Sequence, residues 1–287
     1  FPLHCADLVV ESGVLENYHR NIHVTDSAVI YGDLLMVFPE DTMFVNHIIW
    51  QPGSGGTITE GAFVVGFKWE FLDGTDVSIG SGNDVIMRGT SGSPSVIVNY
   101  DDDATFGNLI LDKPAPAANY AFLSATDTVR VAGNFILEAN NKFKTYGCDM
   151  RVKGTVDMDA TSKIYDIWST GTLEIDGNFY QKGEIAMSAG KVLVHGNYGL
   201  SLTGVLRIDG GSFVCDQPYA ASKAWQYLSG KMVMSGGVFE LSNNSMHVNS
   251  IFVDSISGGD IRIGYTFYAP SAGTFNPTGG TVEMISG

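Results

Sequence analysis

The stretch Val129-Arg-Val-Ala-Gly-Asn-Phe-Ile-Leu137 contains the pattern that decides the fold. On both sides of the Gly-Asn pair, every second residue is apolar, which is typical of a strand with one buried face. Glycine and asparagine accept backbone conformations that most residues resist, so the pair marks a sharp bend. The stretch therefore predicts a strand, a corner, and a second strand that returns Phe135 to the core.

Variants of this unit recur through the central part of the chain. Each places a glycine at the end of a short alternating run, and several follow it with an aromatic or β-branched residue. The corner glycines are Gly133, Gly154, Gly177, Gly196, Gly210 and Gly236. An irregular repeat of about 20 residues indicates a solenoid, whereas propeller blades need about 40 residues or more. With about 20 to 24 residues per coil, the chain predicts roughly 12 to 14 coils, whose strands pair in parallel about 4.8 Å apart.

The charge balance restricts the classes of partner. The chain has 287 residues and a formal net charge of −15, from 16 Lys and Arg against 31 Asp and Glu. Nucleic-acid binding needs clustered Lys and Arg at the phosphates, so we expect no nucleic-acid partner. An acidic surface favours an extracellular protein, or one that collects cations. No run of about 18 apolar residues occurs, so we expect no transmembrane segment.

The chain is predicted to be one continuous domain over residues 1–287, because no linker, low-complexity segment or shift in composition interrupts it. It begins with Phe1 and ends on a run that resembles a strand stopped abruptly, so we expect a fragment of a longer chain. Three cysteines are too few for a disulfide framework, and we expect Cys148 and Cys215 to be buried in strands. One stretch, 220–228, could form either a short helical turn or a loop.

The stretch Phe106-Gly-Asn-Leu-Ile-Leu-Asp-Lys113 resembles a phrase common in the repeat regions of large secreted and surface proteins of Bacteroidetes-type bacteria. Val131–Leu137 and Gly279–Met284 resemble two further phrases of the same regions, and the resemblance covers about residues 77–287. It implies an adhesin-like protein, secreted or at the cell surface, and it names no activity. The fold class that it implies is all-β, a single-stranded right-handed parallel β-helix (solenoid). An antiparallel β-sandwich array is the alternative.

Three consecutive carboxylates, Asp101, Asp102 and Asp103, form the sharpest charge cluster. Hard cations such as Ca²⁺ prefer several carboxylate oxygens, so these residues are the candidate metal ligands and Ca²⁺ is the candidate cofactor. The alternative is a solvated turn between two strands, because consecutive strand residues point in alternate directions.

Tyr219, Trp225 and Tyr227 lie in the one large insertion between repeats. Insertions project from the flank of a solenoid and often carry binding residues, so these three are the candidate carbohydrate-binding residues. Asp176 and Asp209 each precede a corner glycine. They could stack with His195 on one face as a ladder that binds ions or sugars, or they could be ordinary corner residues.

No catalytic residue is assigned from the sequence. His195-Gly-Asn197 is similar to the Gly-His-Gly motif of polygalacturonase-like β-helices, but the accompanying Arg-Ile-Lys motif stands here as Arg207-Ile-Asp209. Glycoside hydrolysis needs two carboxyl groups at a defined separation, which the sequence does not reveal.

The sequence therefore predicts a non-enzymatic structural or adhesive segment of a bacterial secreted or cell-surface protein or extracellular filament. The alternatives are a polysaccharide lyase or glycoside hydrolase of the β-helix type, or a carbohydrate-binding module. The expected partners are neighbouring domains or subunits, stacked end to end through unpaired strand edges, and a polysaccharide or a host or cell-surface glycan.

Overall fold

The structure, a computed structural model, describes residues 2–89, 95–100, 105–114, 120–125, 128–167, 171–196, 200–216, 225–269 and 275–285. Over these residues the regular elements are β-strands alone. The chain divides into two compact units, each considered by itself below. Unit 1 comprises Phe1–Phe143 and Cys148–Lys153, and unit 2 comprises Lys144–Gly147 and Gly154–Gly287. Strand pairing in both units is parallel, which confirms the predicted β-solenoid and excludes the antiparallel sandwich.

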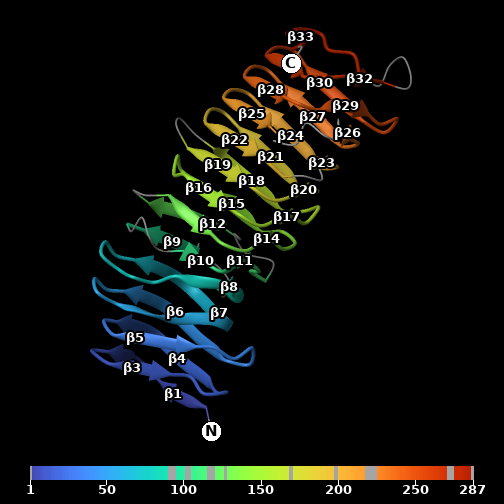
Figure 1. Cartoon of the computed structure of the whole chain (residues 1–287). Coiled ribbons are helices and arrows are strands. Elements are labelled where there is room, and N and C mark those ends of the chain that lie inside the picture. The colour runs from blue at the N-terminus through green and yellow to red at the C-terminus, as the bar shows by residue number, and fades with distance from the viewer. Residues whose placement is uncertain are drawn as a thin grey trace. The chain divides into compact units, whose positions relative to one another are not determined.

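Unit 1 winds long strands into rungs. The β4 strand pairs in parallel with β6, β6 with β7, β7 with β8, and β8 with β11 (Figure 1). Its strands are β1 (Leu3–Cys5), β2 (Leu8–Val10), β3 (Val14–Glu16), β4 (Asn21–Ile30), β5 (Asp33–Met36), β6 (Thr42–Trp50), β7 (Gly55–Phe71), β8 (Ile79–Met87), β9 (Ser95–Asn99), β10 (Thr105–Phe106), β11 (Asn108–Leu111), β12 (Tyr120–Ala125), β13 (Val129–Val131), β14 (Phe135–Leu137) and β16 (Met150–Val152). The β15 strand (Lys142–Lys144) includes the unit boundary.

The register gives the length of a rung. Leu3 lies opposite Ile22, which is 19 residues further along the chain, and Leu109 lies opposite Phe135, which is 26 residues further. The rungs of unit 1 thus vary more widely than the predicted 20 to 24 residues, because loops of different length join strands that keep the same pairing.

Unit 2 has three columns of strands, one for each side of the coil (Figure 1). The first column is β17 (Val156–Met158), β20 (Phe179–Gln181), β23 (Leu200–Leu202), β26 (Trp225–Leu228), β29 (Ser245–Val248) and β32 (Phe267–Tyr268). The second is β18 (Lys163–Ile167), β21 (Glu184–Met187), β24 (Val205–Ile208), β27 (Lys231–Met234) and β30 (Val253–Ile256). The third is β19 (Thr172–Ile175), β22 (Lys191–Val194), β25 (Ser212–Cys215), β28 (Val238–Leu241), β31 (Asp260–Ile263) and β33 (Thr281–Met284). Within a column each strand pairs with the next.

Alternation along each strand builds the core. Every second side chain enters the coil, where like residues stack on successive rungs, as Phe213 does on Phe239 with ring centroids 5.6 Å apart. In unit 1, Trp50 and Trp69 are fully buried with ring centroids 5.9 Å apart. These two tryptophans therefore belong to the hydrophobic core. The side chains between the buried positions of each strand form the outer surface.

The corner glycines have two physical roles. At Gly177 an added Cβ would lie 2.2 Å from the carbonyl oxygen of Gly154, so glycine is needed there because successive rungs approach closely. The predicted backbone conformation, one that most residues resist, occurs instead at Gly211, whose φ is +74°. A Cβ added there would also lie 2.3 Å from the carbonyl oxygen of Gly190. Gly211 directly follows the predicted corner residue Gly210, so the sequence located this corner but misplaced its strained residue by one position.

Two local predictions need correction. Trp225–Leu228 is the strand β26, which pairs in parallel with β23 and β29. Cys148 is half-buried and lies between strands, whereas Cys215 is buried in β25 as expected, and Cys5, Cys148 and Cys215 are all free thiols. Among the described residues, no helix is long and apolar enough to cross a membrane.

Candidate functional site

Most of the residues predicted as site residues fall where the structure makes no statement. Asp101, Asp102, Asp103 and Tyr219 lie outside the described residues, and of Trp225 only the backbone is described. Their proposed roles in Ca²⁺ and carbohydrate binding stay predictions. Tyr227 is described, and its side chain is 52% exposed on β26.

Tyr227 belongs to a continuous outer row of rings, which we call the aromatic column: Tyr227, His247 and Tyr268. Tyr227 lies opposite His247 in the β26–β29 pairing, and His247 lies opposite Tyr268 in the β29–β32 pairing. The ring centroids are 5.0 Å apart for the first pair and 4.8 Å for the second. Tyr268 is 47% exposed, so the column offers ring surface to solvent over three successive rungs.

The register fixes the outward direction of this column. Gln226 and Leu228 are both fully buried, so Tyr227 between them must point away from the core. His247 stands in the same way between two buried residues of β29. On preceding rungs the same outer position is occupied by Ser201 and by Tyr180, which is 39% exposed.

The third side of unit 2 brings Glu174, Asp176 and His195 together. One ligand atom from each lies within 4.8 Å of the other two, and all three side chains are half-buried. The sequence had proposed Asp176 and His195 for one ladder, and the structure confirms that they meet. Glu174 was missed, although its position two residues before Asp176 on an alternating strand places both on the same face.

Asp209 does not join that group, so this part of the predicted ladder is wrong. It follows β24 on the second side of unit 2, where its carboxylate accepts a hydrogen bond from Ser235 at 2.6 Å. Asp209 is thus an ordinary corner residue and not part of a ladder that binds ions or sugars.

Unit 1 carries a cationic hollow on its surface, with a volume of about 240 Å³ and a described lining that includes Thr105, Arg130, Arg151 and Lys153. The β13–β16 register sets Arg130 directly opposite Arg151. Arg130 and Arg151 each stand three residues before a corner glycine, Gly133 and Gly154, and this equal spacing puts them in one column.

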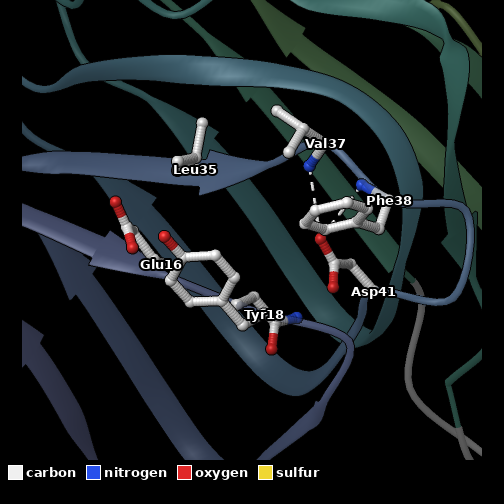
Figure 2. A pocket seen from close by; sticks show the side chains of 7 residues that line it. Glu16, Tyr18, Leu35, Val37, Phe38 and Asp41 are labelled. Carbon is white, nitrogen blue, oxygen red and sulfur yellow. Dashed lines mark hydrogen bonds between the residues drawn. The ribbon is translucent and has the colours of Figure 1, made fainter.

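A second, much smaller pocket lies at a corner of unit 1, where Figure 2 shows Tyr18, Phe38 and Asp41 around it. Its volume of about 10 Å³ suits one water molecule and excludes a sugar or nucleotide. Asp41 is fully buried and Asn17 is 2% exposed, and Asp41 Oδ1 and both amide atoms of Asn17 have no hydrogen-bond partner. The size of the pocket therefore excludes it as a substrate site.

An apolar row runs along the outside of unit 1. Its members lie opposite one another on successive rungs, each between two buried residues, and each is half-buried. They are Phe44, Val64, Ile86, Ile110 and Ile136. The ring of His23 stacks on that of Phe44 with centroids 4.4 Å apart, which extends the row by one rung. Rows of like side chains are thus a general property of this exterior.

Comparison with protein-family models, with curated proteins and with solved structures finds no significant match to the chain. The solenoid fold and its outer columns are therefore the basis for any functional inference.

Proposed function

We propose that the chain is a non-enzymatic structural and adhesive β-solenoid that binds polysaccharide along its outer surface, as part of a bacterial secreted or cell-surface protein or extracellular filament. The aromatic column supports the binding role. The resemblance of the repeats to those of surface proteins from Bacteroidetes-type bacteria supports the adhesin-like setting, and neighbouring domains or subunits are the further partners that we propose.

The chemistry of the aromatic column suits a sugar chain. The C–H face of a pyranose ring is apolar and packs against an aromatic face, while tyrosine hydroxyl and imidazole groups can hydrogen-bond the hydroxyls at the ring edge. Successive rungs lie about 4.8 Å apart, close to the length of one pyranose unit in an extended chain. A polysaccharide lying along the column would thus meet one ring per sugar.

The cationic hollow favours polysaccharides that carry carboxylate or sulfate groups. The planar guanidinium group can bind such oxyanions through two parallel hydrogen bonds, and Arg130 and Arg151 line the hollow on adjacent rungs. Among candidate ligands we therefore rank acidic polysaccharides above neutral ones.

Affinity gel electrophoresis in gels cast with neutral or acidic polysaccharides tests the proposal. We expect one or more acidic polysaccharides to retard the wild-type protein relative to a gel without polysaccharide. In the double variant Tyr227→Ala/Tyr268→Ala this retardation should be at least several-fold smaller. Tyr31→Ala is the matched control, because Tyr31 is 47% exposed, like Tyr268, and belongs to unit 1 rather than to the column. Equal retardation of all three proteins would contradict the assignment to the column.

The enzymatic alternative predicts a different result in the same polysaccharides. A lyase or hydrolase would release new reducing ends, and a lyase would also create an unsaturated uronate that absorbs ultraviolet light. We expect no release above the rate without protein. Sustained turnover by the purified chain would overturn the non-enzymatic proposal.

A further inference from the structure

We propose that Glu174, Asp176 and His195 bind one divalent transition-metal ion, with Zn²⁺ as the best fit, on the outer surface of unit 2. This inference is independent of the proposed polysaccharide binding, because it concerns the third side of the coil and not the aromatic column.

The strand register creates the group. In the β19–β22 pairing Ile175 lies opposite Val194, so the next residues, Asp176 and His195, are neighbours on successive rungs. The backbone N–H of His195 donates to the carbonyl of Ile175 at 2.7 Å, which continues the pairing to this point. Glu174 shares the outward face of Asp176, and so three ligand atoms converge within 4.8 Å.

The contacts of His195 orient its ring within the group. Its Nδ1 lies 3.3 Å from the backbone carbonyl oxygen of Asp216, which can only accept a hydrogen bond, so Nδ1 carries the hydrogen. In the neutral ring Nε2 then has a lone pair, and this atom lies 3.4 Å from Glu174 Oε1. A metal ion bound between these two atoms would take this lone pair and one carboxylate oxygen as ligands, whereas a protonated ring would donate its Nε2–H to Glu174 instead.

The carbonyl that orients the imidazole is itself held in place. The N–H of Asp216 donates to the carbonyl of Val194 at 3.0 Å, and the side-chain amide of Asn243 donates to Asp216 Oδ1 at 3.0 Å. A ligating histidine that donates its other ring N–H to a backbone carbonyl is the usual arrangement in metalloproteins, because it fixes the tautomer and the ring direction.

The donor set selects the kind of ion. Imidazole nitrogen suits zinc and its neighbours, whereas Ca²⁺ takes about 6 to 8 oxygen ligands, which one imidazole and two carboxylates do not supply. Ligand atoms about 2.0–2.1 Å from a tetrahedral ion lie about 3.4 Å apart. The His195 Nε2–Glu174 Oε1 pair has this separation, and the atom of Asp176 lies within 4.8 Å of both. Three protein ligands leave the fourth position of such an ion to water.

Isothermal titration of the chelator-treated chain with Zn²⁺, and with Ca²⁺ in parallel, tests the inference. We expect one Zn²⁺ per chain, no comparable Ca²⁺ binding at this site, and at least a tenfold loss of Zn²⁺ affinity in His195→Ala and in Asp176→Asn. Asp209→Asn is the matched control, because Asp209 also precedes a corner glycine but bonds Ser235 instead. Its Zn²⁺ affinity should equal that of the wild type.

The visible absorption of bound Co²⁺ tests the same site in the wild-type chain, so this measurement does not depend on whether a variant folds. A bound Co²⁺ should show visible absorption typical of tetrahedral nitrogen and oxygen ligation, and the conservative change Glu174→Gln should weaken or shift it while circular dichroism confirms an intact fold. Absence of Zn²⁺ binding, or Zn²⁺ affinity and Co²⁺ absorption unchanged in the His195, Asp176 and Glu174 variants, would overturn the assignment.

Discussion

Asp41 shows how one buried carboxylate holds a corner of the coil. Its Oδ2 accepts the backbone N–H groups of Val37 and Phe38, each at 3.2 Å. We predict that Asp41→Ala lowers the free energy of unfolding by about 2 kcal/mol, because two N–H groups at a packed corner lose their acceptor. Asp41→Asn keeps an acceptor oxygen and should cost less. Urea denaturation measures both, and an alanine variant as stable as the wild type would show that the corner does not need this residue.

His47 makes stability depend on pH. Burial, reinforced by the nearby charge of Lys68, lowers the pKa of His47, and this outweighs the attraction of Glu70, whose Oε2 lies 3.5 Å from His47 Nε2. The unfolded chain, with an ordinary histidine pKa near 6.5, then binds the proton more tightly than the folded chain. The contribution of His47 to stability is therefore fully present above that value and declines as the pH falls through it.

We expect the urea midpoint of the wild type to fall more between pH 7.5 and pH 5.5 than that of His47→Gln. Groups other than His47 contribute equally to both proteins, so the difference isolates this side chain. Identical pH dependence in the two proteins would mean that His47 is protonated as easily in the fold as in the unfolded chain.

At the scale of the element, a corner is defined by how closely two rungs approach. We predict that Gly211→Ala destabilises unit 2 by at least about 3 kcal/mol, since it combines a backbone strain of about 1–3 kcal/mol with a clash against the carbonyl of Gly190. Gly13→Ala is the control, because Gly13 has φ +80° but nothing within 4 Å of an added Cβ. It should cost only the strain. Equal losses of thermal stability in the two variants would show that the close approach of successive rungs at Gly211 does not add to the cost of the substitution.

The elements also show what the sequence could predict. Alternation about Val129–Leu137 specified strand, corner and strand, because burial of one face is a local property of the chain. The outer columns depend instead on which rung lies above which, and the rungs of unit 1 range from 19 to 28 residues. Tyr227 and Tyr268 are thus neighbours of His247 for a reason that no local pattern contains, whereas Glu174 could have been found from its alternation with Asp176.

At the scale of the whole molecule, a solenoid is a sum of rungs that contact only their neighbours. Met43 lies opposite Phe63, so deletion of 43–62 removes one rung of unit 1 and joins Thr42 to Phe63 without disturbing the inward and outward alternation. We predict a folded protein that unfolds cooperatively with a smaller dependence on denaturant. Deletion of 43–63 removes one residue more, turns the following side chains to the wrong face, and should abolish cooperative unfolding.

A chain that tolerated both deletions equally would not be organised by rung register. Circular dichroism and denaturant titration distinguish the two outcomes, since a shortened solenoid keeps its β-strand spectrum while a misregistered one loses its buried core.

The central claim, that the outer columns of the solenoid are its binding surface, is tested most directly by oxidative footprinting with a polysaccharide that retards the protein. Saturating ligand should protect Tyr227, His247 and Tyr268 from hydroxyl-radical labelling and leave Tyr31 as reactive as before. Bound polysaccharide that leaves these three rings fully reactive would contradict the claim.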